Sequence, residues 1–278
     1  GQSQAVVTGI TSKHHAVKEG YAWICYKGIH VDGHQFINLA IEKGARVIIG
    51  DQPPPKDLPS NLTYVQTSNG RIALSHIAAN WFLQPAKQLR LIGITGTNGK
   101  TSTAYFTESI FKAAGIKTAL LGTINYHFGK SILPAKTTTP DQIRLHNLFL
   151  RIANAKIKHV IMEASSQGMA QYRLSGLTFH VGAFTNLTQD HLDYHHSMEN
   201  YLESKLTLFQ QIDPESGCAI VNMDIPAANR VVKATNAPVI SYGVKSEADL
   251  MANDISSDLN GVSFKAITPK GKVIIKLP

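Results

Sequence analysis

The chain contains few cysteines and no long hydrophobic run. Cys25 and Cys218 are the only two cysteines among 278 residues, and no Cys-x-x-Cys pair occurs. A disulfide framework and a zinc site are therefore not indicated. No stretch approaches the roughly 18 apolar residues that span a bilayer, and no secretory signal pattern opens the chain. We expect a soluble, cytoplasmic protein that binds no membrane.

Like charges are not clustered, although the net charge is +8. The lysines and arginines are scattered, without the run of about five like charges that marks a nucleic-acid tail. We therefore expect no nucleic-acid partner, and the basic surface suits a phosphorylated small molecule. The length and the 43% hydrophobic content suffice for two domains with separate cores.

Residues 1–88 are predicted to form a small α/β domain, because short apolar runs alternate in it with helical patterns. A proline-rich connection spans 51–60 and a helix is expected over 71–83. The histidines of this domain have irregular spacing and favour exposed loop positions over a metal cluster. They are His14, His15, His30 and His34.

Residues 89–278 predict a second α/β domain with a mostly parallel sheet covered by helices on both faces. Alternating apolar residues over 262–277, interrupted by a turn at 269–271, predict an antiparallel C-terminal hairpin. Ligands of parallel sheets gather at the carboxyl ends of the strands. The strands are expected at 89–95, 117–121, 159–162, 180–185, 218–222 and 238–242.

A glycine-rich loop lies between the strand 89–95 and a helical pattern that ends at Gly115. The apolar residues Phe106, Ile110, Ala113 and Ala114 share one side of that helix. The order strand, loop, helix is typical of a P-loop that holds the phosphates of ATP or GTP. Ile94 takes the place of the first glycine of the usual pattern, so a turn that binds nothing is the alternative. The loop residues are Gly96, Thr97, Asn98, Gly99, Lys100 and Thr101.

Glu163 ends one predicted strand, and a polar loop containing His191 follows another. With Thr101, Glu163 offers the oxygen ligands that Mg²⁺ prefers, while a histidine ligand suggests a second ion or Mn²⁺. From the residues alone, His191 is better explained as a hydrogen-bond donor of the loop.

Two further polar residues have structural explanations. Lys205 shares a helix face with Tyr201 and Leu208, where a lysine normally extends its charge to the surface. Thr139 and Pro140 suit the N-cap and first position of a helix over 141–155. Neither explanation excludes contact with a ligand.

Taken together, four motifs resemble the Mur ligases of peptidoglycan synthesis, in the same order and spacing. They are the loop 95–101, the strand end 162–166, the segment 185–193 and the helix positions Tyr201, Lys205, Leu208 and Phe209. The segments 32–36, 138–140 and 171–173 are similar to the MurE type, which adds the third residue, meso-diaminopimelate or L-lysine, to UDP-N-acetylmuramoyl-L-alanyl-D-glutamate.

The resemblance implies a role for each matching residue. Lys100, the loop amides and Asn186 would bind ATP. Thr101 and Glu163 would bind one Mg²⁺, Glu163 and His191 a second, and Lys205 would be carbamylated and complete the metal site. Lys100, Glu163, His191 and Lys205 would thus be catalytic. The residues that would contact the UDP-muramoyl-dipeptide are His30, Thr138, Thr139, Ser165, Gln171 and Arg173.

The implied reaction begins with transfer of the ATP γ-phosphoryl group to the D-glutamate γ-carboxylate. The amine of a diamino acid then attacks the acyl phosphate. Residues 1–88 would hold the uridine end and residues 89–278 the ATP, in a monomer. We expect the central domain to be incomplete at its C-terminus and the third domain of the family, which reads the amino acid, to be absent.

Two other interpretations stay open at this point. One is a different ligase of the same superfamily, such as a folylpolyglutamate or cyanophycin type or a lipid-linked amidation subunit. The other is a nucleotide-binding module without catalytic activity.

Overall fold

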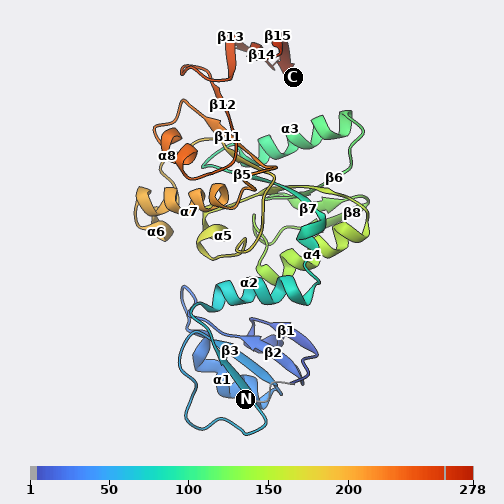
Figure 1. Cartoon of the computed structure of the whole chain (residues 1–278), viewed down its shortest axis with the longest axis vertical. Helices are drawn as coiled ribbons and strands as arrows, with labels where there is room; N and C mark the ends of the chain where they lie inside the picture. The colour runs from blue at the N-terminus through green and yellow to red at the C-terminus, as the bar shows by residue number, and fades with distance from the viewer. Residues whose placement is uncertain (1–4, 260, 278) are drawn as a thin grey trace. The chain divides into compact units, whose positions relative to one another are not determined.

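The computed structural model describes residues 5–259 and 261–277, which form two compact units. The first comprises the residues up to Pro85 with Asp141–Arg151 and Gln171–Gly176, and the second comprises Ala86–Pro140, Ile152–Ala170 and the residues from Leu177 onward. The expected boundary after residue 88 lies close to the first division. Two later segments nevertheless group with the first unit, so the units are not continuous in sequence (Figure 1).

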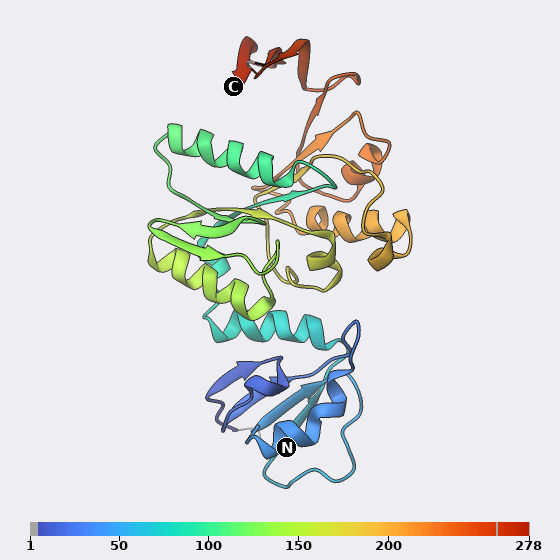
Figure 2. The same cartoon turned by 180° about the vertical axis from the view of Figure 1, so that it is seen from behind.

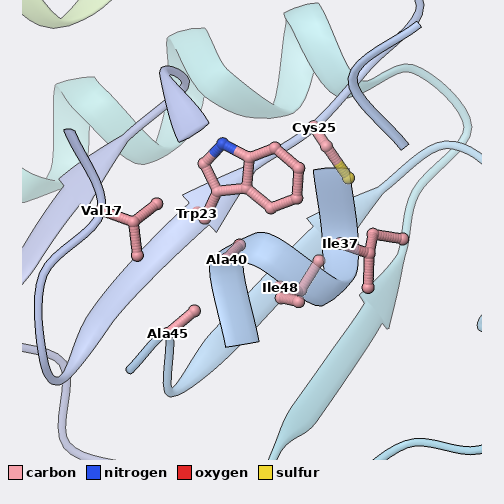
Figure 3. Close-up of a cluster of buried hydrophobic side chains, with 7 residues drawn as sticks. All are labelled: Val17, Trp23, Cys25, Ile37, Ala40, Ala45 and Ile48. Carbon is pink, nitrogen blue, oxygen red and sulfur yellow. The ribbon is translucent and has the colours of Figure 1, made fainter. Parts of the chain in front are cut away.

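The first unit contains a four-stranded parallel sheet with the strand order β1-β2-β3-β4. One face packs its core cluster around Trp23, Ile37 and Ile48, which Figure 3 shows with four further side chains. The other face packs Ile24 and Ile49 against Leu74. Burial on both faces explains why these strands are apolar runs. The strands are β1 Gly9–Thr11, β2 Tyr21–Ile24, β3 Val47–Gly50 and β4 Thr63–Gln66.

Short polar side chains cap the starts of α2 and α4. Asn69 accepts hydrogen bonds from the N–H groups of Arg71 and Ile72 at the start of α2 (Gly70–Trp81). The helix α4 (Gln142–Asn154) is capped by Asp141, whose carboxylate accepts from the N–H of Arg144. The expected N-cap role of Thr139 is therefore wrong. The remaining α-helix of the unit is α1 Ile37–Glu42.

The second unit contains an eleven-stranded sheet with the order β15-β14-β13-β12-β11-β10-β5-β9-β6-β7-β8. Its strands are β5 Arg90–Thr95, β6 Thr118–Leu121, β7 Asn125–Phe128, β8 Ser131–Pro134, β9 His159–Glu163, β10 Val181–Phe184, β11 Cys218–Asn222, β12 Val239–Gly243, β13 Leu250–Asp258, β14 Gly261–Thr268 and β15 Gly271–Leu277.

The six strands predicted for this unit all form, and they pair in parallel from β12 to β6. The antiparallel hairpin β14-β15 is also confirmed. The sequence analysis missed β7, β8 and β13, which extend the two margins of the sheet. Because β5, β9, β10 and β6 run in one direction, their carboxyl ends share one edge.

Helices lie on both faces of the parallel strands. α3 (Lys100–Ala113) packs Ala104 against Ile92 and Ile94, whereas α7 (Met198–Gln210) brings Leu208 close to Gly93 on the opposite face (Figures 1 and 2). The other helices are α5 Ser166–Ala170, α6 Leu192–His195 and α8 Ala228–Lys233.

The apolar side of α3 that the sequence suggested is not the buried one. Phe106 and Ile110 are 55% and 68% exposed, and the helix meets the sheet through Ala104 and Phe111. Among the described residues, no helix combines the length and apolar character needed to cross a membrane.

Candidate nucleotide and metal site

The glycine loop connects the end of β5 to the start of α3. Gly96 has φ +142° and Gly99 φ +81°, both in the range that favours glycine. A Cβ at Gly96 would collide with the Thr185 hydroxyl, so only glycine fits there. Apart from Gly99 itself and its two chain neighbours, no atom of the described residues lies within 4 Å of the Cβ position of Gly99, so this turn faces open space. The loop thus has the backbone geometry and the room that a phosphate group needs.

A second loop, from the end of β10, binds the glycine loop through reciprocal hydrogen bonds. Asn186 Nδ2 donates to the carbonyl of Asn98 over 3.0 Å, and the Asn98 N–H donates to Asn186 Oδ1 over 2.9 Å. Thr185 Oγ1 also donates to the Asn98 carbonyl, at 2.7 Å. Asn186 therefore supports the loop that would contact ATP, and its direct contact with the nucleotide stays a prediction.

Lys100 begins α3 and folds back over its own loop. Its ammonium donates to the carbonyls of Gly96 at 3.0 Å and Thr97 at 2.8 Å. Burial lowers the pKa of Lys100, while the nearby Glu163 and Asp190 carboxylates oppose that shift. The cation is thus held beside the turn where phosphates would lie.

Glu163 ends β9 with its side chain fully buried. Its Oε2 accepts a hydrogen bond from Thr101 Oγ1 at 2.9 Å, so the P-loop threonine and the strand-end carboxylate meet as expected. Thr123 donates to Oε1 from its N–H and to Oε2 from its hydroxyl. Oxygen donors of this kind, gathered at one point, fit a Mg²⁺ ion.

The threonines before α4 connect to the same strand end. Thr139 is fully buried, and its hydroxyl donates to the Glu163 carbonyl at 2.8 Å and accepts from the Ser165 N–H at 2.9 Å. Thr138 Oγ1 lies 3.1 Å from Thr123 Oγ1. The predicted substrate residues Thr138, Thr139 and Ser165 therefore lie at the same edge of the sheet as Glu163.

Lys205 is buried at 1% exposure, so the expectation that its charge reaches the surface is wrong. Its ammonium donates to the Gly96 carbonyl at 2.8 Å and lies 4.2 Å from the ring centre of Tyr201. Burial, followed by repulsion from Lys100, lowers the pKa of Lys205 to about 7. In a large fraction of the molecules, the Lys205 amine is therefore uncharged near neutral pH.

His191 belongs to the loop after β10 and is half exposed. Its Nε2 lies 3.6 Å from Asp190 Oδ2, and its ring is 6.3 Å from that of Tyr201, between centres. Among the described residues, no three His, Cys, Asp or Glu side chains could hold a metal by themselves. The expected metal site therefore depends on Thr101 and a modified Lys205 in addition to Glu163 and His191.

A model described as "Mur ligase middle domain" matches residues 94–278, and one described as "Mur ligase family, catalytic domain" matches residues 6–82. The chain belongs to the Mur ligase family. The Mur ligase resemblance drawn from the motifs is thereby confirmed.

Relatives in this family are similar over the whole chain but are longer. UDP-N-acetylmuramoyl-L-alanyl-D-glutamate–2,6-diaminopimelate ligase of Bacillus licheniformis is 38% identical to this chain. The alignment covers 100% of this chain and 57% of that enzyme. The enzyme of the same name from Geobacter metallireducens is 35% identical, and the alignment covers 96% of this chain and 53% of that enzyme. The chain thus spans about half the length of these relatives.

Solved structures confirm the Mur ligase fold. A UDP-N-acetylmuramoyl-L-alanyl-D-glutamate–2,6-diaminopimelate ligase superposes with a TM-score of 0.82 at 23% identity, covering 97% of this chain and 55% of that one. MurF of Thermotoga maritima in complex with ADP gives a TM-score of 0.58 at 19% identity, and the superposition covers 98% of this chain and 58% of the MurF chain.

In the first unit of the chain, the candidate substrate residues occupy different surroundings. His30 is exposed in the loop after β2, and Arg173 donates to Gln171 Oε1 at 2.7 Å. His34 is not an exposed loop histidine: its side chain is 8% exposed, with Nδ1 2.7 Å from Asp32 Oδ1 and Nε2 3.3 Å from Asp51 Oδ1. That expectation was wrong for His34.

A cavity of about 320 Å³ opens at the carboxyl ends of β1 and β2 in the same unit. The rings of His14 and Phe36 stack beside it, with centres 4.0 Å apart. Lys13 and His15 add basic groups to the lining. The sequence analysis did not identify this cavity.

Sequence analysis also assigned no role to three residues at this edge of the sheet. Tyr201 donates to Thr97 Oγ1 and faces Lys205, His195 Nε2 lies 3.0 Å from Ser166 Oγ, and Thr123 holds Glu163. The dipeptide Gly122-Thr123 directly after the strand 118–121 was the available signal for the third of these.

Proposed function

We propose that this chain carries the nucleotide-binding and UDP-substrate-binding parts of an ATP-dependent amide ligase of the MurE type. The reaction would join a diamino acid to UDP-N-acetylmuramoyl-L-alanyl-D-glutamate. The names of the relatives favour 2,6-diaminopimelate as that amino acid. The observation that carries the proposal is the convergence of Thr101, Glu163 and Lys205 on one glycine loop.

The chemistry of the first step explains why these groups gather. A carboxylate is a poor acyl donor, and phosphorylation by ATP turns it into an acyl phosphate that an amine can attack. Lys100 and the loop amides would hold the phosphates in line with the attacking carboxylate. Mg²⁺ held by Thr101, Glu163, His191 and a modified Lys205 would neutralise charge on the transferring group.

Lys205 has the properties that carbamylation requires. A neutral amine attacks CO2 to form a carbamate and releases one proton, which converts a cation into an anionic oxygen ligand. The pKa of about 7 supplies the neutral amine. Carbamylation of Lys205 would also remove the repulsion between its protonated amine and the nearby Lys100 ammonium.

The cavity of the first unit suits the uridine end of the substrate. The stacked pair of His14 and Phe36 offers a flat surface for a base, and Lys13 and His15 provide positive charge for a diphosphate. We propose that Gln171 and Arg173 contact the peptide of the same substrate, together with Thr138, Thr139, Ser165 and His30. We also propose that the protein acts in the cytoplasm, where its proposed substrates would meet it, and that it is a monomer.

Isothermal titration tests the substrate assignment on residues 1–278. UDP-N-acetylmuramoyl-L-alanyl-D-glutamate should bind, whereas UDP-N-acetylmuramoyl-L-alanine should bind at least about tenfold more weakly, because it lacks the carboxylates of D-glutamate. Folate should not bind. His14→Ala should weaken binding of the dipeptide substrate, and the exposed control Lys56→Ala should not. Tight binding of folate in place of the muramoyl dipeptide would point to the folylpolyglutamate type instead.

A further inference from the structure

The turn after β6 packs directly against the Glu163 carboxylate. A Cβ at Gly122 would collide with Glu163 Oε1, so the absence of a side chain allows this approach. The next residue, Thr123, donates its N–H to Oε1 at 2.8 Å and its hydroxyl to Oε2 at 3.0 Å. The two ends of the carboxylate are therefore held in different ways.

The difference determines which oxygen can accept a metal. Gly122 packs against Oε1, which leaves no room for a metal ion there. Oε1 also accepts a hydrogen bond from the backbone N–H of Thr123, and this donor cannot rotate away. Oε2 accepts two hydroxyl hydrogen bonds, from Thr101 and Thr123, which together use its two lone pairs. A metal ion that binds Oε2 must displace one of them.

Thr123 is the donor that can leave. Thr101 belongs to the glycine loop and is expected to stay next to the metal, whereas Thr123 has a second partner within reach. Its hydroxyl lies 3.1 Å from Thr138 Oγ1, so rotation of the proton alone moves the hydrogen bond from Glu163 to Thr138.

We propose that Thr123 is a positioning residue whose hydroxyl transfers its hydrogen bond from Glu163 to Thr138 when a divalent cation binds. The reason lies in the single proton of a hydroxyl. While Thr123 donates to Glu163, it accepts from Thr138, whose proton points inward. Once Thr123 donates to Thr138, the Thr138 proton is free to point outward toward an anionic group of the substrate.

This inference rests on the proposed function for the identity of the substrate, but its first test needs no substrate. We would titrate Mg²⁺ into the ADP complex of residues 1–278 and measure affinity by calorimetry. Thr123→Val should tighten Mg²⁺ binding about fivefold, because no hydroxyl competes for Oε2, and Thr138→Val should weaken it by a similar factor. In the Thr123→Val background, Thr138→Val should have no further effect. Thr123→Ser should match the wild type.

Two controls separate this role from a structural one. Thr107→Val removes a hydroxyl that, among the described residues, donates to the Thr103 carbonyl within α3 alone, and it should leave Mg²⁺ affinity unchanged. Melting temperatures of all variants would show whether each folds, and the serine variant restores the hydroxyl if the valine variant does not fold. Weaker Mg²⁺ binding by Thr123→Val, or additive effects of the two valines, would overturn the proposal.

The second test measures binding of the UDP-muramoyl-dipeptide with and without Mg²⁺ in the ADP complex. Mg²⁺ should tighten it about fivefold more in the wild type than in Thr123→Val. Equal enhancement by Mg²⁺ in the wild type and in Thr123→Val would contradict the proposed transfer of the hydrogen bond. If the dipeptide fails to bind even the wild type, the proposed substrate is wrong, while the Mg²⁺ titration still decides whether Thr123 and Thr138 are coupled.

Discussion

The hydroxyl of Thr101 donates to Glu163 Oε2 over 2.9 Å and joins the start of α3 to the end of β9. These residues are far apart in sequence, and the parallel order β5-β9 brings them to one edge. The contact gathers oxygen donors next to a loop shaped for phosphates, which is the arrangement that magnesium-dependent phosphoryl transfer needs.

Loss of the loop cation should abolish phosphate release from ATP. Lys100 is the ammonium held against the Gly96 and Thr97 carbonyls beside the proposed phosphate site. We expect Lys100→Ala to lower ATP-dependent phosphate release in the presence of the UDP-muramoyl-dipeptide by about 10² to 10³-fold. Lys112→Ala, at the far end of α3, is the matched control and should retain activity.

Lys205 should take up CO2. At pH 8 its amine is mostly neutral, because its pKa is about 7, and ¹³C-bicarbonate should produce a carbamate signal in the ¹³C spectrum. The signal should fade below pH 7 as the amine becomes protonated, and Lys205→Ala should lack it. That variant should lose about 10²-fold in phosphate release and recover partly with added short carboxylic acids. Normal turnover in the variant would contradict the assignment of Lys205 as a metal ligand.

Thr139 should contribute to stability through its buried hydroxyl. Replacement by valine keeps the shape but removes the bonds to the Glu163 carbonyl and the Ser165 N–H. We expect a loss of about 1 to 3 kcal/mol in the free energy of unfolding, measured by urea denaturation. An unchanged midpoint would show that water replaces these bonds.

His146 should make stability depend on pH. Its ring is buried at 1% exposure, both nitrogens lack a hydrogen-bond partner in the part of the chain that the structure describes, and burial lowers its pKa from 6.5 to about 4. The unfolded state binds the proton more readily, so stability is fully present above pH 6.5 and is lost as the pH falls toward 4. His146→Leu should therefore raise the melting temperature more at pH 5 than at pH 7.5.

The control for this titration is His15→Leu, which changes an exposed histidine and should shift both melting temperatures equally. A His146→Leu variant with the same gain at both pH values would contradict the role of proton uptake.

Local sequence patterns were sufficient for the parallel strands and for the glycine loop. The period of apolar residues and the position of Gly96 and Gly99 reflect short-range geometry, which survives in the fold. The burial of Lys205 could not be predicted in this way, because the helix face it occupies becomes interior only when Tyr201 and the Gly96 carbonyl close over it. The same applies to His34, which two carboxylates from separate segments enclose.

The cap of α4 shows how tertiary contacts override local preference. Thr139 has the sequence context of an N-cap, but its hydroxyl is used by Glu163 and Ser165, and Asp141 takes over as the cap. Thr123 was missed for a related reason: its role depends on strand order, which places β6 beside β9.

The most direct test of a shared nucleotide and metal site is calorimetric titration of a non-hydrolysable ATP analogue into residues 1–278. We predict one site whose affinity rises with Mg²⁺ and falls at least about tenfold in both Lys100→Ala and Glu163→Gln. Binding that ignores Mg²⁺ and both substitutions, or no binding at all, would contradict the account.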